Sequence, residues 1–150
     1  MKRLLLLILL LPLAACGPTR SVFPPSVRVQ GIQPLKNGHW QVTLRFQNNA
    51  WRAMRFKQLD VRLNIGARHA GDLNAALDLD IAATASDIVI LKLIPSPAAR
   101  AILAGTSSGN VAYSLQGTIL VIPESESTRQ YPVHQQGYLS PTPGLSGVWR

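Results

Sequence analysis

One stretch, residues 40–47, limits the folds open to this chain more than any other. Its apolar and polar side chains alternate without exception, with Trp40, Val42, Leu44 and Phe46 on one parity and Gln41, Thr43, Arg45 and Gln47 on the other. Because successive side chains of a strand point to opposite faces of a sheet, this period of two predicts a half-buried antiparallel strand. The rest of the chain must then supply the strands that pair with it and the apolar layer that covers it.

Turn signals divide the chain on both sides of this strand. Lys36-Asn37-Gly38 stands just before it, and Asn-Gly between two apolar alternations is a strong hairpin signal. Gly66 to Gly71 is expected to form another turn. We expect the other strands at residues 27–32, 59–65, 77–81, 88–94, 111–121 and 131–135, with Gly117 as a bulge or bend in the longest of them.

One short helix is expected after the apolar run at residues 88–94. Ser96 suits the N-cap, Pro97 the first helical position and Gly105 the end of the helix. Strands about 8–12 residues apart, without helices alternating between them, are typical of all-β folds. The predicted fold class is therefore an all-β, antiparallel two-sheet sandwich of the immunoglobulin or fibronectin III type, with about seven strands and one short helix.

The amino-terminal segment carries a separate signal. Lys2 and Arg3 precede an apolar run that ends in Leu13-Ala14-Ala15-Cys16, and Cys16 is the single cysteine of the chain. This composition describes a secretory signal, and the run is shorter than the roughly 20 residues that cross a bilayer. The motif resembles a bacterial lipobox, which implies removal of residues 1–15 as a lipoprotein signal peptide and acylation, palmitate included, of Cys16. The alternative is an ordinary signal peptide, or an uncleaved anchor, with a thiol at Cys16.

Behind Cys16 the sequence predicts a tether, a domain and a tail. Residues 16–25 contain three prolines and no apolar period, and we expect them to hold the domain off the membrane. Residues 26–139 are the predicted sandwich, which is long enough to fold without a disulfide or a metal. Residues 140–150 contain two prolines and two glycines and are expected to form a flexible tail.

The membrane anchor and the net charge limit which partners the protein can have. Two or more acyl chains hold a protein stably on a membrane, so the expected location is the cell envelope, lipid-anchored. Gly17 in place of an aspartate favours, by resemblance to bacterial sorting rules, the outer membrane facing the periplasm. Without residues 1–15 the chain keeps 13 of its 15 Lys and Arg residues against 7 Asp and Glu. This balance suits anionic lipid or glycolipid phosphate, or it serves solubility alone, and a secretory leader excludes nucleic acid as a partner.

Several segments resemble, in the right order, the late-embryogenesis-abundant group 2 (LEA-2) family, also called the water-stress and hypersensitive-response (WHy) domain. They are Val27-Arg28-Val29-Gln30-Gly31-Ile32, Val42-Thr43-Leu44-Arg45-Phe46-Gln47-Asn48, residues 88–93, Tyr113-Ser114-Leu115-Gln116-Gly117, and Tyr131-Pro132 with Gly137. Asn48-Asn49-Ala50 departs from the family's Asn-Pro-Asn turn because it lacks the proline. The resemblance covers residues 25–139 and implies a fibronectin-like β-sandwich, a role in protection against desiccation or other stress, and no known catalytic residues.

No set of catalytic, cofactor-binding or metal-binding residues stands out in the sequence. His39, His69 and His134 lie on three separate segments without Cys, Asp or Glu at metal-ligand spacing. Asp78 and Asp80 would share one strand face in equal environments, which suits a polar outer face better than an acid–base pair. Neither a glycine-rich phosphate loop nor a nucleophile motif is present. The sequence therefore predicts a protein that is not an enzyme and uses no cofactor.

The one candidate binding cluster is basic. Four basic residues surround the turn that follows the strand at residues 40–47: Arg45, Arg52, Arg55 and Lys57. Trp51 lies among them. Arginine binds phosphate through two parallel hydrogen bonds and tryptophan favours membrane interfaces, so contact with an anionic lipid is one interpretation. The other is a solvated loop with Trp51 packed against the end of the sandwich.

Two functions of different classes follow from these features. The first is a non-enzymatic, membrane-anchored envelope lipoprotein that protects against desiccation or other stress, as the LEA-2 resemblance implies. The second is a binding or assembly module on the periplasmic face of the outer membrane. Such a module would contact lipid phosphate or a protein partner through the basic loop or through a sheet edge.

Overall fold

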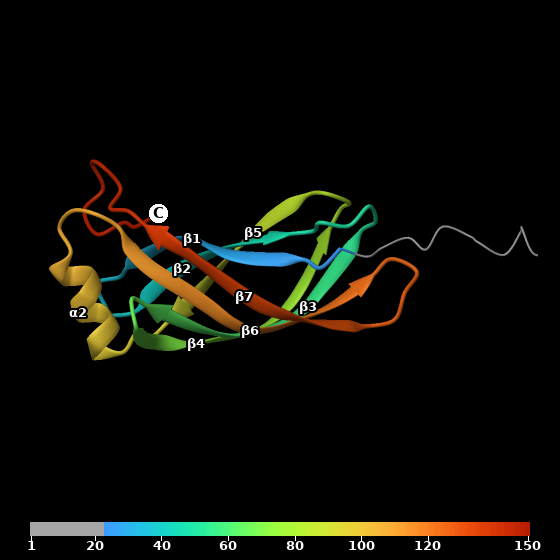
Figure 1. Ribbon diagram of the computed structural model, residues 1–150, viewed down its shortest axis with the longest axis horizontal. Helices are drawn as coiled ribbons and strands as arrows, with labels where there is room; N and C mark the ends of the chain where they lie inside the picture. The colour runs from blue at the N-terminus through green and yellow to red at the C-terminus, as the bar shows by residue number, and fades with distance from the viewer. Residues whose placement is uncertain (1–22) are drawn as a thin grey trace, which may run out of the picture.

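The computed structural model describes residues 23–150, so the predictions for the signal peptide and for Cys16 lie outside the described residues. Seven strands and one helix make up this part of the chain (Figure 1). In chain order they are β1 (Ser26–Pro34), β2 (Trp40–Gln47), β3 (Met54–Ile65), β4 (Arg68–Ile81), β5 (Ser86–Leu93), α2 (Pro97–Gly105), β6 (Val111–Pro123) and β7 (Arg129–Leu139).

The strands form two antiparallel sheets. The first has the strand order β1-β2-β5 and the second has the order β4-β3-β6-β7. Every pairing between neighbouring strands is antiparallel. The predicted all-β sandwich of two sheets, with seven strands and one short helix, is confirmed.

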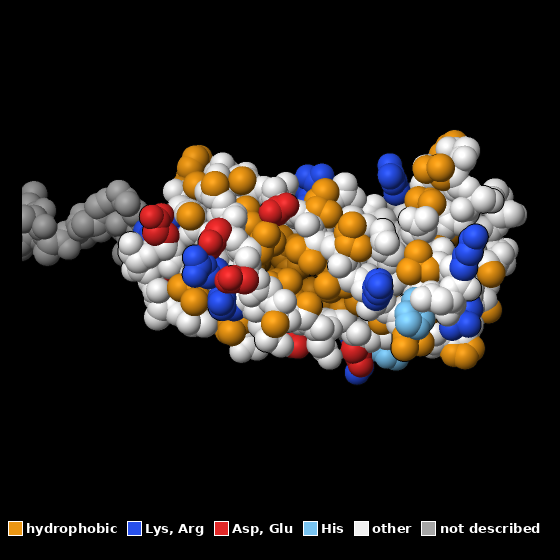
Figure 2. Space-filling model, turned by 180° about the vertical axis from the view of Figure 1, so that it is seen from behind, with side chains coloured by type: hydrophobic (Ala, Val, Ile, Leu, Met, Phe, Trp, Pro, Cys, Tyr) orange, Lys and Arg blue, Asp and Glu red, His pale blue; other side chains and the backbone are white. Residues whose placement is uncertain are grey.

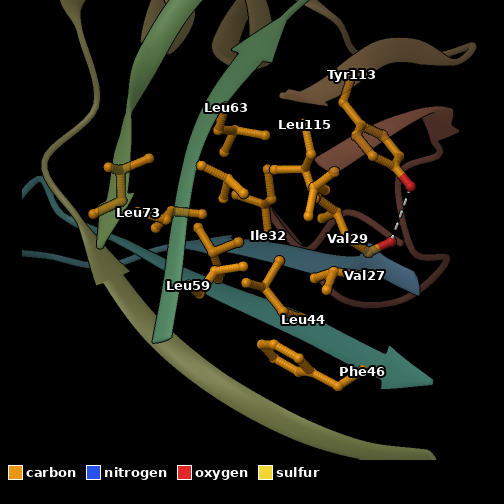
Figure 3. Packing of buried hydrophobic residues seen from close by; sticks show 14 of the residues in the cluster. Val27, Val29, Ile32, Leu44, Phe46, Leu59, Leu63, Leu73, Tyr113 and Leu115 are labelled. Carbon is orange, nitrogen blue, oxygen red and sulfur yellow. Dashed lines mark hydrogen bonds between the residues drawn. The ribbon is translucent and has the colours of Figure 1, made fainter. Parts of the chain in front are cut away.

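The core lies between the sheets because alternate side chains of each strand point inward. The four apolar side chains of β2 are at most 1% exposed, as their alternation predicts. Leu44 from this strand lies beside Leu59 from β3 in the opposite sheet (Figure 3), and the Phe46 ring meets Phe56 of β3 edge to face, with centroids 5.7 Å apart. The cluster runs from Val27 to Trp149 and includes residues of both sheets and of α2. Residues 23–150 therefore hold a continuous hydrophobic core of their own.

The strands run along the long axis of the molecule, so their connections gather at two ends (Figure 1). We call the end where the described chain begins the entry end, and it consists of residues 23–25, 48–53, 82–85 and 124–128. We call the other end the helix end, and it consists of residues 35–39, 66–67, 94–110 and 140–150. The candidate sites below differ chiefly in which end they occupy.

Two local predictions are confirmed. Residues 35–39 close the β1–β2 hairpin, where the backbone N–H of Leu35 donates to the carbonyl of His39 at 2.7 Å. Gly38 has a φ of 81°, which glycine adopts without strain. Helix α2 starts at its predicted cap, because Ser96 Oγ accepts a hydrogen bond from the backbone N–H of Ala99 at 3.2 Å.

Of the bulge or bend predicted at Gly117, the bulge is absent. Strand β6 stays in regular register with β3 at this residue, and the register shifts instead between Phe56 and Gln58. Gly117 is needed for a different reason, since a Cβ there would collide with the backbone of Asp60 and Val61. The sequence thus indicated an important glycine, but the reason is the lack of space for a side chain and not a bulge.

The predicted flexible tail is also wrong. Trp149 is 4% exposed, and its backbone exchanges two 2.9 Å hydrogen bonds with Ile32 of β1. Gly144 and Gly147 each have a φ of 77°. These glycines, which suggested flexibility, instead make turns that bring residues 140–150 back onto the sandwich.

Candidate functional site

The structure places the predicted basic cluster on both sides of the sandwich. Arg45 lies on the outer face of β2, in the three-stranded sheet. Its guanidinium donates to Ser86 Oγ at 3.1 Å and to Gln30 Oε1 at 3.4 Å. Arg55 and Lys57 belong to β3 in the four-stranded sheet, whose outer face points away from Arg45. The cluster therefore does not form one continuous surface.

Two of these cations pair with the two aspartates that the sequence placed on an outer strand face. Arg55 donates to both carboxylate oxygens of Asp80, at 2.7 and 2.9 Å. Lys57 Nζ lies 3.3 Å from Asp78 Oδ1. The hydrogen bond from Arg55 holds the pKa of Asp80 below its usual range, and the same bond raises the pKa of Arg55. All four side chains are exposed, so these pairs add little to stability.

A third cation joins a network at the entry end. Arg52 Nη1 lies 2.8 Å from Glu126 Oε1, and Arg129 Nη2 lies 2.6 Å from Glu126 Oε2. The Arg52 and Glu126 side chains are only 22% and 18% exposed, so solvent screens this pair less than the others. The network ties the β2–β3 connection to the β6–β7 turn.

Trp51 is 80% exposed, so the interpretation that packs it against the sandwich end is wrong. The exposed indole keeps open a contact between this loop and lipid. The cations beside it would, however, have to leave their acidic partners to bind phosphate. A lipid contact through this loop thus stays a prediction, and it competes with ion pairs already present.

The residue that organises the entry end is Asn48, which the sequence indicated only as a strand break. It is the one buried polar residue in the described chain, with no exposed surface. Its amide donates to the carbonyls of Arg52, Ile81 and Ala82 at 2.8, 3.0 and 3.0 Å, and its Oδ1 accepts from the backbone N–H of Ala50 at 2.9 Å. Asn48 thereby joins two loops that are distant in sequence. The one sequence signal for this role was the position of Asn48 at the end of a segment, residues 42–48, that resembles the LEA-2 family.

Tyr113 plays a similar structural part between the sheets. Its hydroxyl, on β6, donates to the carbonyl of Val29 on β1 at 3.4 Å (Figure 3). Gly137 leaves room for the ring, since a Cβ there would lie 2.7 Å from it. Burial raises the pKa of Tyr113. These residues of the LEA-2-like motifs serve the packing of the fold.

The outer face of the four-stranded sheet carries rows of polar side chains. Two rows cross all four strands in register: Asp72, Arg62, Gln116 and His134; and His69, Asn64, Ser114 and Gln136. Neighbours within a row interact, with Arg62 Nε 3.5 Å from Asp72 Oδ1 and Asn64 Nδ2 3.0 Å from Ser114 Oγ. Next to Gly117, which has no side chain, Asp72, Arg62 and Gln116 of the first row border a shallow hollow of about 470 Å³.

A larger hollow, of about 660 Å³, lies at the helix end between α2 and residues 141–149. No charged side chain lines it. Among residues 23–150, no three or more His, Cys, Asp or Glu side chains gather as a metal site would require. The described helix is too short to span a membrane, and the search for such a helix covered only these residues.

The described chain is thus a two-sheet β-sandwich with a polar outer face and with ion-paired side chains at its entry end. No family model and no curated protein sequence matches it significantly. Among solved structures it is similar to AT1g01470 from Arabidopsis thaliana, with a TM-score of 0.52 and 12% identity over 88% of this chain and 87% of that one. This likeness shows a shared fold.

Two further structures are similar to a lesser degree. One is At2g46140.1, a protein described provisionally as late embryogenesis abundant (LEA), with a TM-score of 0.48 and 14% identity over 93% of this chain and 85% of that one. The other is a protein from Archaeoglobus fulgidus, with a TM-score of 0.46 and 5% identity over 81% and 98% of the two chains.

Proposed function

We propose that this protein is a non-enzymatic, membrane-anchored envelope lipoprotein that protects neighbouring molecules against desiccation or other stress. The observation that carries the protective role is the polar outer face of the four-stranded sheet. Its rows of amides, hydroxyls and paired charges can both donate and accept hydrogen bonds. The residues that resemble the LEA-2 family support the same role.

The physical basis of protection is exchange of hydrogen-bond partners. A protein or lipid headgroup that loses water leaves polar groups unpaired, and each such group costs free energy. The ion pairs on the polar face are exposed and contribute little individually. Their side chains can therefore turn to a neighbour's polar groups at low cost. The core stays in place because these residues are not part of it.

The absence of turnover is part of the proposal, and the environment of the acids supports it. Asp78 and Asp80 each pair with a base, and both stay largely exposed. An acid–base pair for catalysis needs two carboxyl groups in different environments. Glu126, the least exposed acid of an ion pair here, is held between two arginines.

Freeze–thaw of a labile enzyme tests protection. Residues 23–150 should preserve more activity than an equal mass of albumin. A variant with Arg62, Asp72 and Gln116 changed to Ala should protect less. A matched variant on the other sheet, with Gln33, Gln41 and Thr43 changed to Ala, should protect as well as wild type. If wild type protects no better than albumin, the protective role is wrong.

Anchoring at the outer membrane, facing the periplasm, rests on the sequence around Cys16. Fractionation of a Cys16→Ser variant beside wild type, with mass spectrometry of the amino terminus, tests it. Wild type should carry acyl chains on Cys16 and sediment with the outer membrane, and the variant should not. An unacylated wild-type terminus would contradict the proposal.

A second candidate function is assembly through the edge of the three-stranded sheet. Strand β5 pairs only with β2, and its outward-facing Ile88 and Ile90 are 44% and 56% exposed. An extended segment of an envelope protein could pair with such an edge. Pull-down should then lose the partner with Ile90→Lys. It should keep the partner when Arg45, Arg52, Arg55 and Lys57 are changed to Ser, and the opposite pattern would favour the basic loop.

A further inference from the structure

The charges of the molecule are divided between its two ends. The entry end and the strand ends beside it hold the paired acids, such as Asp80 and Glu126. The segments that form the helix end contain no Asp or Glu. The nearest acid on an adjoining strand, Asp72, lies within reach of Arg62 and His69. The helix end is therefore cationic, whereas the entry end is close to neutral.

Besides Arg150, four cations give the helix end its charge: Lys36, Arg68, Lys92 and Arg100. All four are exposed, and none of them forms an ion pair in the described chain. Figure 2 shows Lys and Arg side chains spread over the end that carries α2, with no acidic side chain among them on this face. They are free to meet anions without first breaking a contact with an acid.

The four cations come from segments that pack together at this end. Arg100 of α2 lies beside the β1–β2 hairpin, since its Nη1 would be 3.8 Å from a Cβ on Gly38. Helix α2 also contacts the start of β4, where Ser96 Oγ donates to the carbonyl of His69 at 2.6 Å. Lys92 stands opposite Gln41, at the same end of β2 as the hairpin. The cations thus border one region instead of being scattered over the molecule.

Exposed apolar side chains accompany these cations. Ile94, which follows β5, is 70% exposed, Tyr138 at the end of β7 is 72% exposed, and Leu145 is 52% exposed. A soluble polyanion needs only the cations for binding. Exposed apolar side chains beside cations are instead typical of surfaces that insert into the headgroup region of a bilayer.

We propose that the helix end is a docking surface for a bilayer that contains anionic phospholipid. Lys36, Arg68, Lys92 and Arg100 contact the phosphates, and Ile94 with Leu145 enters the interface. The surface lies at the opposite end of the molecule from Phe23, where the described chain begins (Figure 1). This surface differs from the lipid contact predicted for the basic loop, because it consists of different residues at the other end of the molecule. It is also independent of a protective role.

Cosedimentation of residues 23–150 with vesicles tests the proposal. Wild type should bind vesicles that contain about one-third phosphatidylglycerol in phosphatidylcholine and should not bind phosphatidylcholine alone. Each Lys or Arg near such a surface contributes about fivefold to partitioning. Changing Lys36, Arg68, Lys92 and Arg100 to Ser should therefore lower the partition coefficient by about a hundredfold or more. Absence of binding by wild type would overturn the proposal.

The matched control removes the same number of positive charges elsewhere, with Arg45, Arg52, Arg55 and Lys57 changed to Ser. This variant should bind nearly as tightly as wild type. Equal losses in both variants would mean that only net charge matters, and loss in the control alone would assign lipid binding to the basic loop. Either result overturns the proposal. Unchanged urea midpoints would show that the two proteins remain folded.

A third variant, with Ile94 and Leu145 changed to Ser, separates a bilayer from a soluble anion. It keeps every charge, so binding of inorganic phosphate would be unaffected. Vesicle binding should fall by about a hundredfold, because each of the two apolar side chains contributes about tenfold when it leaves water. If this variant binds vesicles as tightly as wild type, the surface recognises charge alone, and the bilayer proposal is wrong.

Discussion

Replacement of Asn48 by Ala should cost much of the stability of the domain. The change leaves four backbone groups without their side-chain partner: the N–H of Ala50, and the carbonyls of Arg52, Ile81 and Ala82, which share the two N–H groups of the amide. At a net contribution of about 0.5–1.5 kcal/mol each, the loss is about 4 kcal/mol. This is a large share of the roughly 5–15 kcal/mol that stabilises an ordinary domain.

Urea unfolding of residues 23–150, followed by tryptophan fluorescence, measures this loss. With a slope of about 2 kcal/mol per molar urea, the midpoint should fall by about 2 M. Asn49→Ala is the matched control, since Asn49 is exposed and its amide donates to the carbonyl of Pro24 at 2.9 Å. It should cost less than about 1 kcal/mol. Equal effects of the two substitutions, or a loss below about 1 kcal/mol for Asn48→Ala, would refute the role given to the buried amide.

Three further outcomes are expected from the same unfolding assay. Gly117→Ala should destabilise the domain by more than about 3 kcal/mol, because its Cβ has no room beside the backbone of Asp60, and a normal midpoint would contradict this. Trp149→Ala should cost about 3–5 kcal/mol, as for other buried aromatic side chains, whereas a loose tail would make it neutral. Tyr113→Phe should change the alkaline pH dependence. Because burial raises the pKa of Tyr113, its contribution is complete below about pH 10 and is lost as pH rises through the folded-state pKa. Wild type should therefore lose, above about pH 10, stability that the Phe variant keeps, and parallel curves would contradict the assignment.

Local patterns predicted the elements whose causes are local. The alternation in residues 40–47 is confirmed as β2, and the Asn37-Gly38 turn is confirmed as the hairpin before it. The cap at Ser96 is confirmed as the start of α2. In each case one short stretch contains both the signal and the interaction that satisfies it. The number of sheets follows from these elements because their apolar faces must cover each other.

Strand β4 shows where local patterns fail. The glycines at 66 and 71 predicted a turn over this whole range, but only the first of them, with a φ of 58°, makes the turn. Gly71 continues the strand and pairs with Leu63. A side chain at residue 71 would press on Leu93 of the other sheet, so the reason for glycine lies in a contact that the sequence does not show.

The candidate site was the least predictable part for the same reason. Arg55 and Asp80 meet because β3 and β4 pair in one particular register, and that register includes a shift near Lys57. Three of the four cations of the sequence cluster are therefore held in ion pairs in the structure, and Arg45 is not. The helix end shows the converse, since its four cations come from segments that are far apart along the chain.

The contact between Trp149 and Ile32 has a further effect on how the protein can associate. The outer strands of the three-stranded sheet are β1 and β5, and the backbone of β1 at Ile32 is already occupied by Trp149. A strand from another molecule can thus add beside β5 and not beside this part of β1. Two copies joined through β5 would each present β1 outward, and its pairing position at Ile32 is already taken, so a further strand could not pair there. Residues 140–150 in this way limit growth of the three-stranded sheet beyond its β1 edge.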